Sequence, residues 1–189
     1  MLRGSSHAEL WESSHAVLRE SSHAVLWGLS HAVLSKFATA HIHGQKVKCK
    51  GGVQVKVPEI ATMKEWCEFY GVDVKRGIAV VFKAVDNDYS TANARPKKIF
   101  YTPGSKPTAP DWDGGRQECG GGLHFSPTPG HALDFNREAK RFIACPVKVS
   151  EIKIVKNPHY PEKIKAPGVC VPCWEVDRCG KAIPAKEAK

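Results

Sequence analysis

The sequence has no long apolar run and no recognisable export signal. No stretch approaches the roughly 18 consecutive apolar residues of a membrane-spanning helix, so we expect no membrane partner. The opening residues, MLRGSSH, lack the apolar core of a signal peptide, so we expect a protein that is not secreted by that route.

Cysteine is present, but the pattern of a disulfide framework is missing. The chain has seven cysteines, and an odd number without an export signal argues against disulfide pairing. We therefore expect reduced thiols, some of which could hold a metal ion.

Nucleic-acid recognition motifs are absent, although the chain is basic. Its formal net charge is +9, and residues 1–44 carry as many acidic as basic side chains, so the whole excess lies in residues 45–189. Dispersed lysines without an arginine-rich helix are compatible with nucleic acid or another anionic partner, and equally with solubility alone.

The first 44 residues consist of eight-residue repeats. The units are SSHAELWE (5–12), SSHAVLRE (13–20), SSHAVLWG (21–28), LSHAVLSK (29–36) and a decayed FATAHIHG (37–44). In a helix, eight residues turn the chain through about 800°, so the apolar stripe would wander around the axis. In a strand, alternation keeps Ser, Ala and Leu of every unit on one face and His on the other. The phase favours a β-solenoid, and a helix is the alternative because Ala, Leu and Glu are good helix formers.

If two repeats make one coil, equivalent residues stack about 4.8 Å apart. The expected stacked pairs are His7 over His23, His15 over His31, Trp11 over Trp27 and Val17 over Val33. The repeated alanines are expected inside the coils: Ala8, Ala16, Ala24 and Ala32. The histidine column could bind a metal ion, or it could be a periodic outward position without a ligand. So short an array, with tryptophan and valine outside, predicts a homo-oligomer or a place in a larger assembly.

Residues 45–189 are expected to form one basic globular domain. A hairpin is predicted over 47–57, turning at Gly51-Gly52, and a helix over 58–71, with Pro58 at its start and Gly71 as its cap. Further predicted elements are strands at 78–85, 99–101, 142–149, 151–155 and 169–176 and a helix at 131–140. Strands outnumber helices and do not alternate with them. The predicted fold class is therefore α+β, with a solenoid in 1–44 and a small mixed-sheet domain with one or two helices in 45–189.

The segment CGGGLHFS (119–126) is the first candidate site. Three glycines would let the backbone approach a ligand closely. Cys119 and His124 could act as nucleophile and base, or as metal ligands. The alternative is a glycine-rich turn that leads into a strand. The segment belongs to a long loop over 102–131, and such loops in compact domains are often functional.

A second candidate site is a possible metal centre. Cys170 and Cys173 form a CxxC pair, which is half of a structural zinc site, and Cys179 could extend it. Cys119, Cys145 or His159 would have to supply the remaining ligand, and plain reduced thiols are the alternative. Four aspartates on predicted loops could hold a cation, namely Asp86, Asp88, Asp111 and Asp113. They lack the spacing of a calcium-binding loop, however.

The chain resembles actinobacterial and bacteriophage proteins in which Ser-Ala-Val repeats precede a small domain. The resemblance is carried by the octads and by residues 82–85, 101–104, 119–127 and 144–147. This resemblance implies a phage-type structural or interaction protein, located in the host cytoplasm or the virion. Its repeats would drive assembly and its basic domain would contact a partner.

A second resemblance is to ADP-ribosyltransferases. FSPT (125–128) precedes ALDF (132–135), and Glu175 lies on a late predicted strand. The resemblance implies an enzyme with His124, Ser126 and Glu175 in its pocket. However, Lys83 stands where that family has an Arg or His that holds the dinucleotide, and no Glu-x-Glu pair is present. A nucleic-acid-binding module is the remaining alternative.

Overall fold

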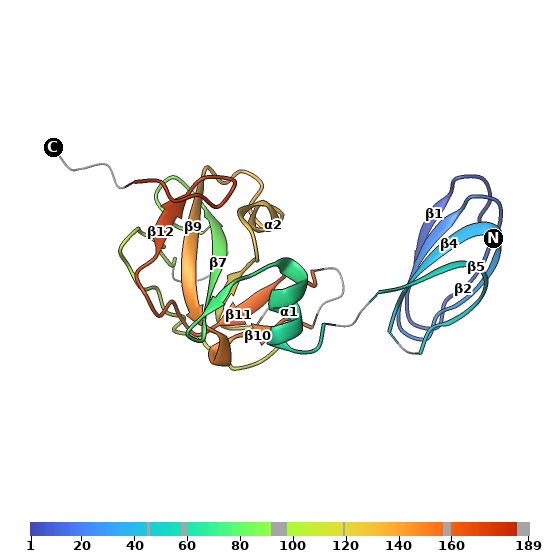
Figure 1. Cartoon of the computed structure of the whole chain (residues 1–189), viewed down its shortest axis with the longest axis horizontal. Coiled ribbons are helices and arrows are strands. Elements are labelled where there is room, and N and C mark those ends of the chain that lie inside the picture. Colours follow the sequence, from blue (N-terminus) through green and yellow to red (C-terminus); the bar gives the residue numbers. More distant parts are fainter. Residues whose placement is uncertain (45, 58–59, 92–97, 119, 157–159, 185–189) are drawn as a thin grey trace. The chain divides into compact units, whose positions relative to one another are not determined.

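The computed structural model describes residues 1–44, 46–57, 60–91, 98–118, 120–156 and 160–184. The chain divides into two compact units, Met1–Glu59 and Ile60–Lys189, which are described separately (Figure 1). The first is a β-solenoid, and the second combines small sheets with two α-helices in its described part. The predicted α+β class, with an N-terminal solenoid, is confirmed.

The first unit stacks parallel strands into flattened coils. Its strands are β1 (His7–Leu10), β2 (His15–Leu18), β3 (His23–Leu26), β4 (His31–His43) and β5 (Lys48–Val57). His7 pairs with His23, and His15 pairs with His31, so two repeats make one coil as predicted. Each coil has two arms, and the long strand β4 passes through both arms of its coil (Figure 1).

Side-chain alternation along the strands fills the solenoid interior. Leu18, Ala24 and Leu26 have no exposed surface, and the remaining leucines and alanines pack against them. Ala8 and Ala16 lie in the first strand of each arm, where fewer coils cover them, and they are half-buried. The expected interior position of the repeated alanines is confirmed.

The predicted hairpin over 47–57 is wrong, and its residues belong to the solenoid. β5 is a single strand that runs parallel to β4 and pairs with both of its arms. Gly51 and Gly52 have φ of 79° and 55°, and a Cβ on Gly51 would collide with the carbonyl oxygen of Leu34. The two glycines therefore turn the chain from one arm to the next within a coil. As a result, the first unit extends to Glu59, beyond the predicted boundary at Gly44.

The second unit contains two antiparallel sheets. The larger has the order β12 (Trp174–Val176), β9 (Arg141–Lys148), β7 (Ile78–Val85) and β6 (Val74–Lys75). The smaller has the order β10 (Lys153–Ile154), β11 (Ile164–Ala166) and β8 (Leu123–Phe125). A bridge between Phe82 and Ser126 connects β7 to the chain just after β8. The strand predicted at 78–85 is confirmed, and the one at 142–149 begins and ends one residue earlier.

Both α-helices are shorter than predicted. α1 (Met63–Tyr70) begins after Thr62, whose hydroxyl and the Glu65 carboxylate form a capping box, and it ends at Gly71 with φ of 64°. Pro58, the predicted start, lies outside the described residues. α2 (Pro129–Leu133) stops well before Lys140. Residues 134–140 are exposed or half-buried, so they offer no second apolar turn to bury.

Three predicted strands are shorter than expected or missing. At 99–101, only Phe100 forms an isolated bridge, with Ser90. At 151–155, a 3₁₀ turn, η1 (Val149–Glu151), leaves only the two residues of β10. At 169–176, only the last three residues form β12, because Pro172 has no N–H for a ladder.

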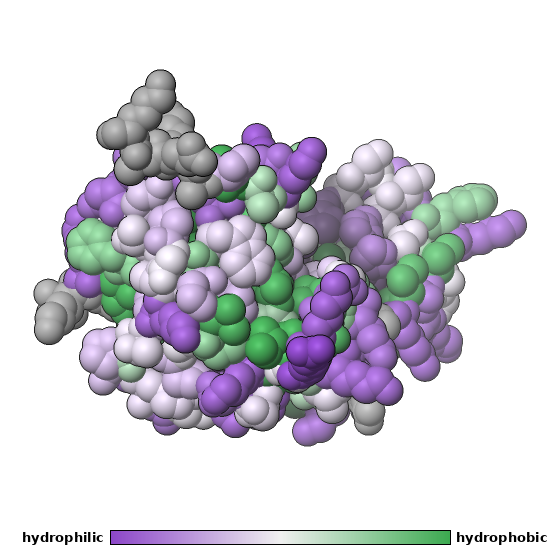
Figure 2. Space-filling model, turned by 60° about the vertical axis from the view of Figure 1, so that its left-hand side comes forward, coloured by the Kyte–Doolittle hydropathy of each residue, from purple (hydrophilic) through white to green (hydrophobic). Residues whose placement is uncertain are grey.

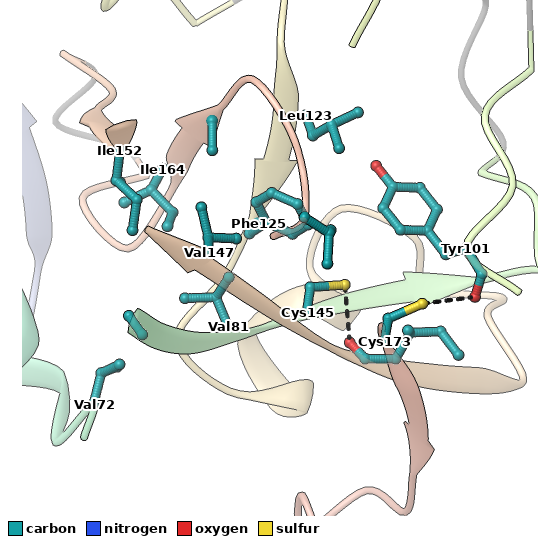
Figure 3. Packing of buried hydrophobic residues seen from close by; sticks show 14 of the residues in the cluster. Val72, Val81, Tyr101, Leu123, Phe125, Cys145, Val147, Ile152, Ile164 and Cys173 are labelled. Atoms are coloured by element: carbon teal, nitrogen blue, oxygen red, sulfur yellow. Dashed lines mark hydrogen bonds between the residues drawn. The ribbon is translucent and has the colours of Figure 1, made fainter. Parts of the chain in front are cut away.

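The core of the second unit is built from both sheets and α1. Its largest fully buried members include Trp66 of α1, Phe125 of β8 and Val147 of β9. Figure 3 shows Phe125, Val81 and Val147 packed together, with Tyr101 on one side and Ile164 on another. This core fixes β7 and β8 next to each other, and that placement determines the site described below.

Candidate functional site

A cavity of about 150 Å³ opens beside β7 and β8 in the second unit. Paired backbone bonds between Phe82 and Ser126, of 2.8 and 3.0 Å, hold its floor. Phe82, Phe125 and Phe135 contribute aromatic surface to it. Its polar lining comes from six residues, namely Lys83, Thr91, His124, Ser126, Asn136 and Lys163.

Both sequence-predicted residues of the 119–126 segment that are described line this cavity. His124 lies in the middle of β8 and is half-buried, whereas Ser126 follows the strand and is 2% exposed. Lys83 Nζ donates to the His124 carbonyl oxygen at 2.8 Å, which ties β7 to β8 at the cavity wall. Cys119 lies outside the described residues. The segment is thus both a strand in a sheet and the wall of a pocket.

The charged residues in the described lining of the cavity are both basic. Lys83 and Lys163 line it, and none of its described lining residues is acidic. Lys163 Nζ forms an ion pair with the Glu118 carboxylate at 3.6 Å, and Glu118 itself does not line the cavity. The same Nζ lies 5.0 Å from the centre of the Phe135 ring. Two ammonium groups, hydroxyls, an amide and aromatic walls together suit a small anion.

Glu175 is not brought to this cavity, so the predicted trio of His124, Ser126 and Glu175 is not assembled. The Glu175 carboxylate accepts hydrogen bonds from Arg141 Nη1 at 2.7 Å and from the Tyr89 hydroxyl at 3.0 Å. Arg141 also lies over the Tyr89 ring, 4.8 Å from its centre. Burial and the bond to Glu175 raise the pKa of Tyr89. Glu175 therefore joins β12 to β9 and to the loop after β7.

The three cysteines proposed for zinc do not converge. Cys173 is buried and its thiol donates to the Thr102 carbonyl at 3.2 Å, whereas Cys170 donates to the Pro146 carbonyl at 3.3 Å. Figure 3 shows Cys173 and Cys145 inside the core, each bonded to a backbone oxygen. Cys179 is exposed on a turn. Within the described part of the chain, no three His, Cys, Asp or Glu side chains could hold a metal ion. Cys119 and His159, two of the further ligands considered for zinc, lie outside the described residues.

The glycines of the 119–126 segment approach the chain itself. A Cβ on Gly121 would collide with the Asp111 backbone, and one on Gly122 would lie 2.7 Å from the Trp112 ring. Gly121 N–H donates to Asp113 at 2.8 Å, and Asp113 also pairs with the fully buried Lys165 at 3.1 Å. Hydrogen bonds from Gly115, Gly121 and Lys165 lower the pKa of the Asp113 carboxyl. The glycines thus let this loop fold tightly in front of β8, and no ligand is needed to explain them.

Sequence reasoning treated Lys83 only as a departure from the ADP-ribosyltransferase pattern, and it missed three further polar residues of the described lining: Thr91, Asn136 and Lys163. Lys83 had a signal, because it is the only polar residue of the apolar strand IAVVFKAV. The other three come from segments without a pattern, and only the fold brings them to the cavity.

The solenoid carries a second set of candidate residues on its surface. Val33 is 53% exposed and Phe37 is 68% exposed. Figure 2 shows that apolar groups, drawn in green, reach the surface of the chain. Val17 stacks on Val33, as predicted. The tryptophans are less exposed than expected, because Trp27 stacks between Trp11, at 5.0 Å, and His43, at 3.5 Å between ring centres.

Comparisons with protein-family models, with curated proteins and with solved structures find no match to this chain. Within the described residues, no helix combines the length and the apolar character needed to cross a membrane.

Proposed function

We propose that this chain is an interaction protein that assembles through its solenoid. The observation that carries the proposal is the apolar surface on that unit. Val33 and Phe37 are more than half exposed on a unit that contains only a few coils. Val33 also lies beside its register partner Val17, which is 37% exposed. Contiguous exposed apolar groups mark contact surfaces in soluble proteins. The resemblance of the octads to bacteriophage repeat proteins points the same way, toward a structural protein of the host cytoplasm or virion.

The side of the solenoid is the proposed route of association. β5 pairs with β4 along one edge, so it is the last strand of the stack among the described residues. Its lysines are exposed, namely Lys48, Lys50 and Lys56. Charged side chains on an edge strand oppose pairing with another edge. The stacked valines at Val17 and Val33 lie on the outer face of one arm, where lateral contact needs no free backbone groups.

The association is expected to be weak for a single pair of chains. One outer face, four residues long and three strands wide, covers about 200 Å². A stable interface buries about 800 Å² on each partner. Self-association should therefore depend on concentration and grow through repeated contacts.

Sedimentation velocity of the full chain from about 1 to about 100 micromolar tests the proposal. The double variant Val33→Lys, Phe37→Lys should reduce the average sedimentation coefficient to that of the monomer. The matched control is Val74→Lys, Val171→Lys, because these residues of the second unit are 45% and 40% exposed. A monomer at every concentration, or an equal loss in both double variants, would contradict the proposal.

A second candidate function is the binding of a small anion in the cavity of the second unit. The specific observation is the lining by Lys83 and Lys163 beside His124 and Ser126, without a described acidic residue. The ADP-ribosyltransferase resemblance would make that anion the diphosphate of a dinucleotide. The position of Glu175 outside the cavity favours binding over catalysis of that kind.

Thermal shift with inorganic pyrophosphate and with NAD tests the second candidate. Each ligand that binds the cavity should raise the melting temperature of the wild-type chain, and Lys163→Met should remove the shift. Lys156→Met is the control, because Lys156 is exposed and does not line the cavity. No shift with either probe, or an equal loss in the control, would refute the anion site.

A further inference from the structure

The outer face of the solenoid carries a pair of histidines in unusually close contact. His7 of β1 and His23 of β3 are register partners, one coil apart. Their Nδ1 atoms are 3.1 Å apart, and their ring centres are 4.9 Å apart. His7 is exposed and His23 is half-buried, so solvent reaches the pair from the side of His7.

This distance fits two ligands of one metal ion. Imidazole nitrogen binds late first-row divalent ions at about 2.0–2.1 Å. Two such ligands are about 2.9 Å apart at a right angle and about 3.4 Å apart in a tetrahedron. The observed separation of 3.1 Å lies between these values. The two nitrogens are therefore as far apart as two neighbouring ligands of one metal ion, and binding requires each ring to tilt so that its lone pair points at the ion rather than at the other nitrogen.

We propose that His7 and His23 form a two-histidine site for a late first-row divalent metal ion such as Ni²⁺, Cu²⁺ or Zn²⁺. Neutral imidazole suits these ions, and water completes the coordination shell because no third protein ligand converges among the described residues. On binding, the ring that donates its Nδ1–H changes tautomer: its proton moves by way of solvent to Nε2, so that both rings bind the ion through Nδ1 as neutral imidazoles and no net proton is released. The inference is independent of the proposed function.

A third histidine ring lies beside the pair. The rings of His23 and His41 are 4.8 Å apart between centres and meet edge to face, at 73°. Val25 of β3 is the register partner of His41, so His41 is not in register with His23. The pair of facing nitrogens is therefore formed by His7 and His23.

The solenoid supplies its own matched control. His15 and His31 occupy the equivalent register on the other arm, and their ring centres are 4.7 Å apart. Their rings meet edge to face, at 70°, and no hydrogen bond joins them. Composition and ring spacing are thus nearly the same for both pairs, whereas the first pair is tilted at 54° and has two nitrogens facing each other.

Isothermal titration of the untagged full chain with Ni²⁺ alone, at pH 7.5, tests the site. Ni²⁺ is the probe because it does not oxidise the free thiols. Exposed thiols are alkylated beforehand, so that Cys179 cannot bind the metal. We expect one equivalent of Ni²⁺, an affinity at least tenfold lower in His7→Gln, and less than a twofold change in His15→Gln. Both residues are exposed, so both variants should fold, and circular dichroism checks this.

Histidine-selective NMR gives a second readout that does not depend on affinity. Paramagnetic Ni²⁺ should broaden the imidazole signals of His7 and His23 before those of His15 and His31. Absence of binding, an equal loss of affinity in the two variants, or simultaneous broadening of all four signals would overturn the proposal.

Discussion

Gly121 lies where the glycine-rich loop passes closest to the backbone of Asp111. A Cβ at this position would be 2.6 Å from the Asp111 carbonyl carbon and closer still to its oxygen. The backbone of Gly121 is not left-handed, so alanine could adopt its φ without strain. The substitution Gly121→Ala therefore tests the packing of this loop alone.

Alanine at Gly121 should force the loop and the segment around Asp111 apart. The bond from Gly121 N–H to Asp113 lies across that contact, so it should lengthen as well. Overpacking of this kind costs about 1–3 kcal/mol. The loss of glycine's freedom in the unfolded chain offsets up to about 1 kcal/mol. We expect a net loss of about 2 kcal/mol, or about 7 °C in the melting temperature of a domain of this size.

Gly130→Ala is the matched control. Gly130 is exposed in α2, and a Cβ there would come no closer than 3.6 Å to the Thr128 hydroxyl. Alanine in a helix should be neutral or stabilising by up to about 1 kcal/mol. Urea unfolding followed by tryptophan fluorescence measures both variants, since Trp112 packs on this loop. Equal stability of the two variants would refute the packing argument.

Three further outcomes follow from other parts of the structure. Thr62→Ala removes the cap of α1 and should lower the urea midpoint by the equivalent of about 1 kcal/mol. Burial lowers the pKa of His23 and His43, so the unfolded chain binds more protons than the folded chain at acidic pH. The stability of the solenoid should therefore be full above about pH 6.5 and should fall as the pH drops below that value. Urea unfolding at about pH 7.5 and about pH 5 measures the difference. Burial raises the pKa of the Cys145 thiol well above its usual value, so iodoacetamide followed by mass spectrometry should modify Cys179 in the folded chain and Cys145 only in urea.

The solenoid could be predicted in detail because its signal is repeated. One octad with alternating polarity is ambiguous between helix and strand, whereas four octads in the same phase favour a period of two. The same logic gave the stacked pairs, and His7 does pair with His23. The last coil could not be predicted. β5 no longer carries the octad, and its glycine pair is as typical of a hairpin as of the corner of a coil.

The glycine-rich segment illustrates a different limit of local reasoning. Three consecutive glycines indicate a close approach of the backbone, and that part of the prediction is confirmed. The sequence does not say what is approached. Here it is the segment from Asp111 to Asp113, held in place by the buried Lys165 on β11, which is far along the chain. A ligand and a distant segment of the same chain produce the same local pattern.

The cavity residues gather because β7 makes two kinds of contact. Along its length it pairs with β9, which secures the core, and at Phe82 it also bridges to Ser126. The next residue, Lys83, alternates away from Phe82 and reaches the His124 carbonyl. A lone lysine in an otherwise apolar strand is costly to bury unless it is bonded, so its position predicts a polar partner nearby. Beside the 119–126 segment, Lys83 was therefore a second signal in the sequence that could have located the cavity, and β8 supplies the partner that it predicts.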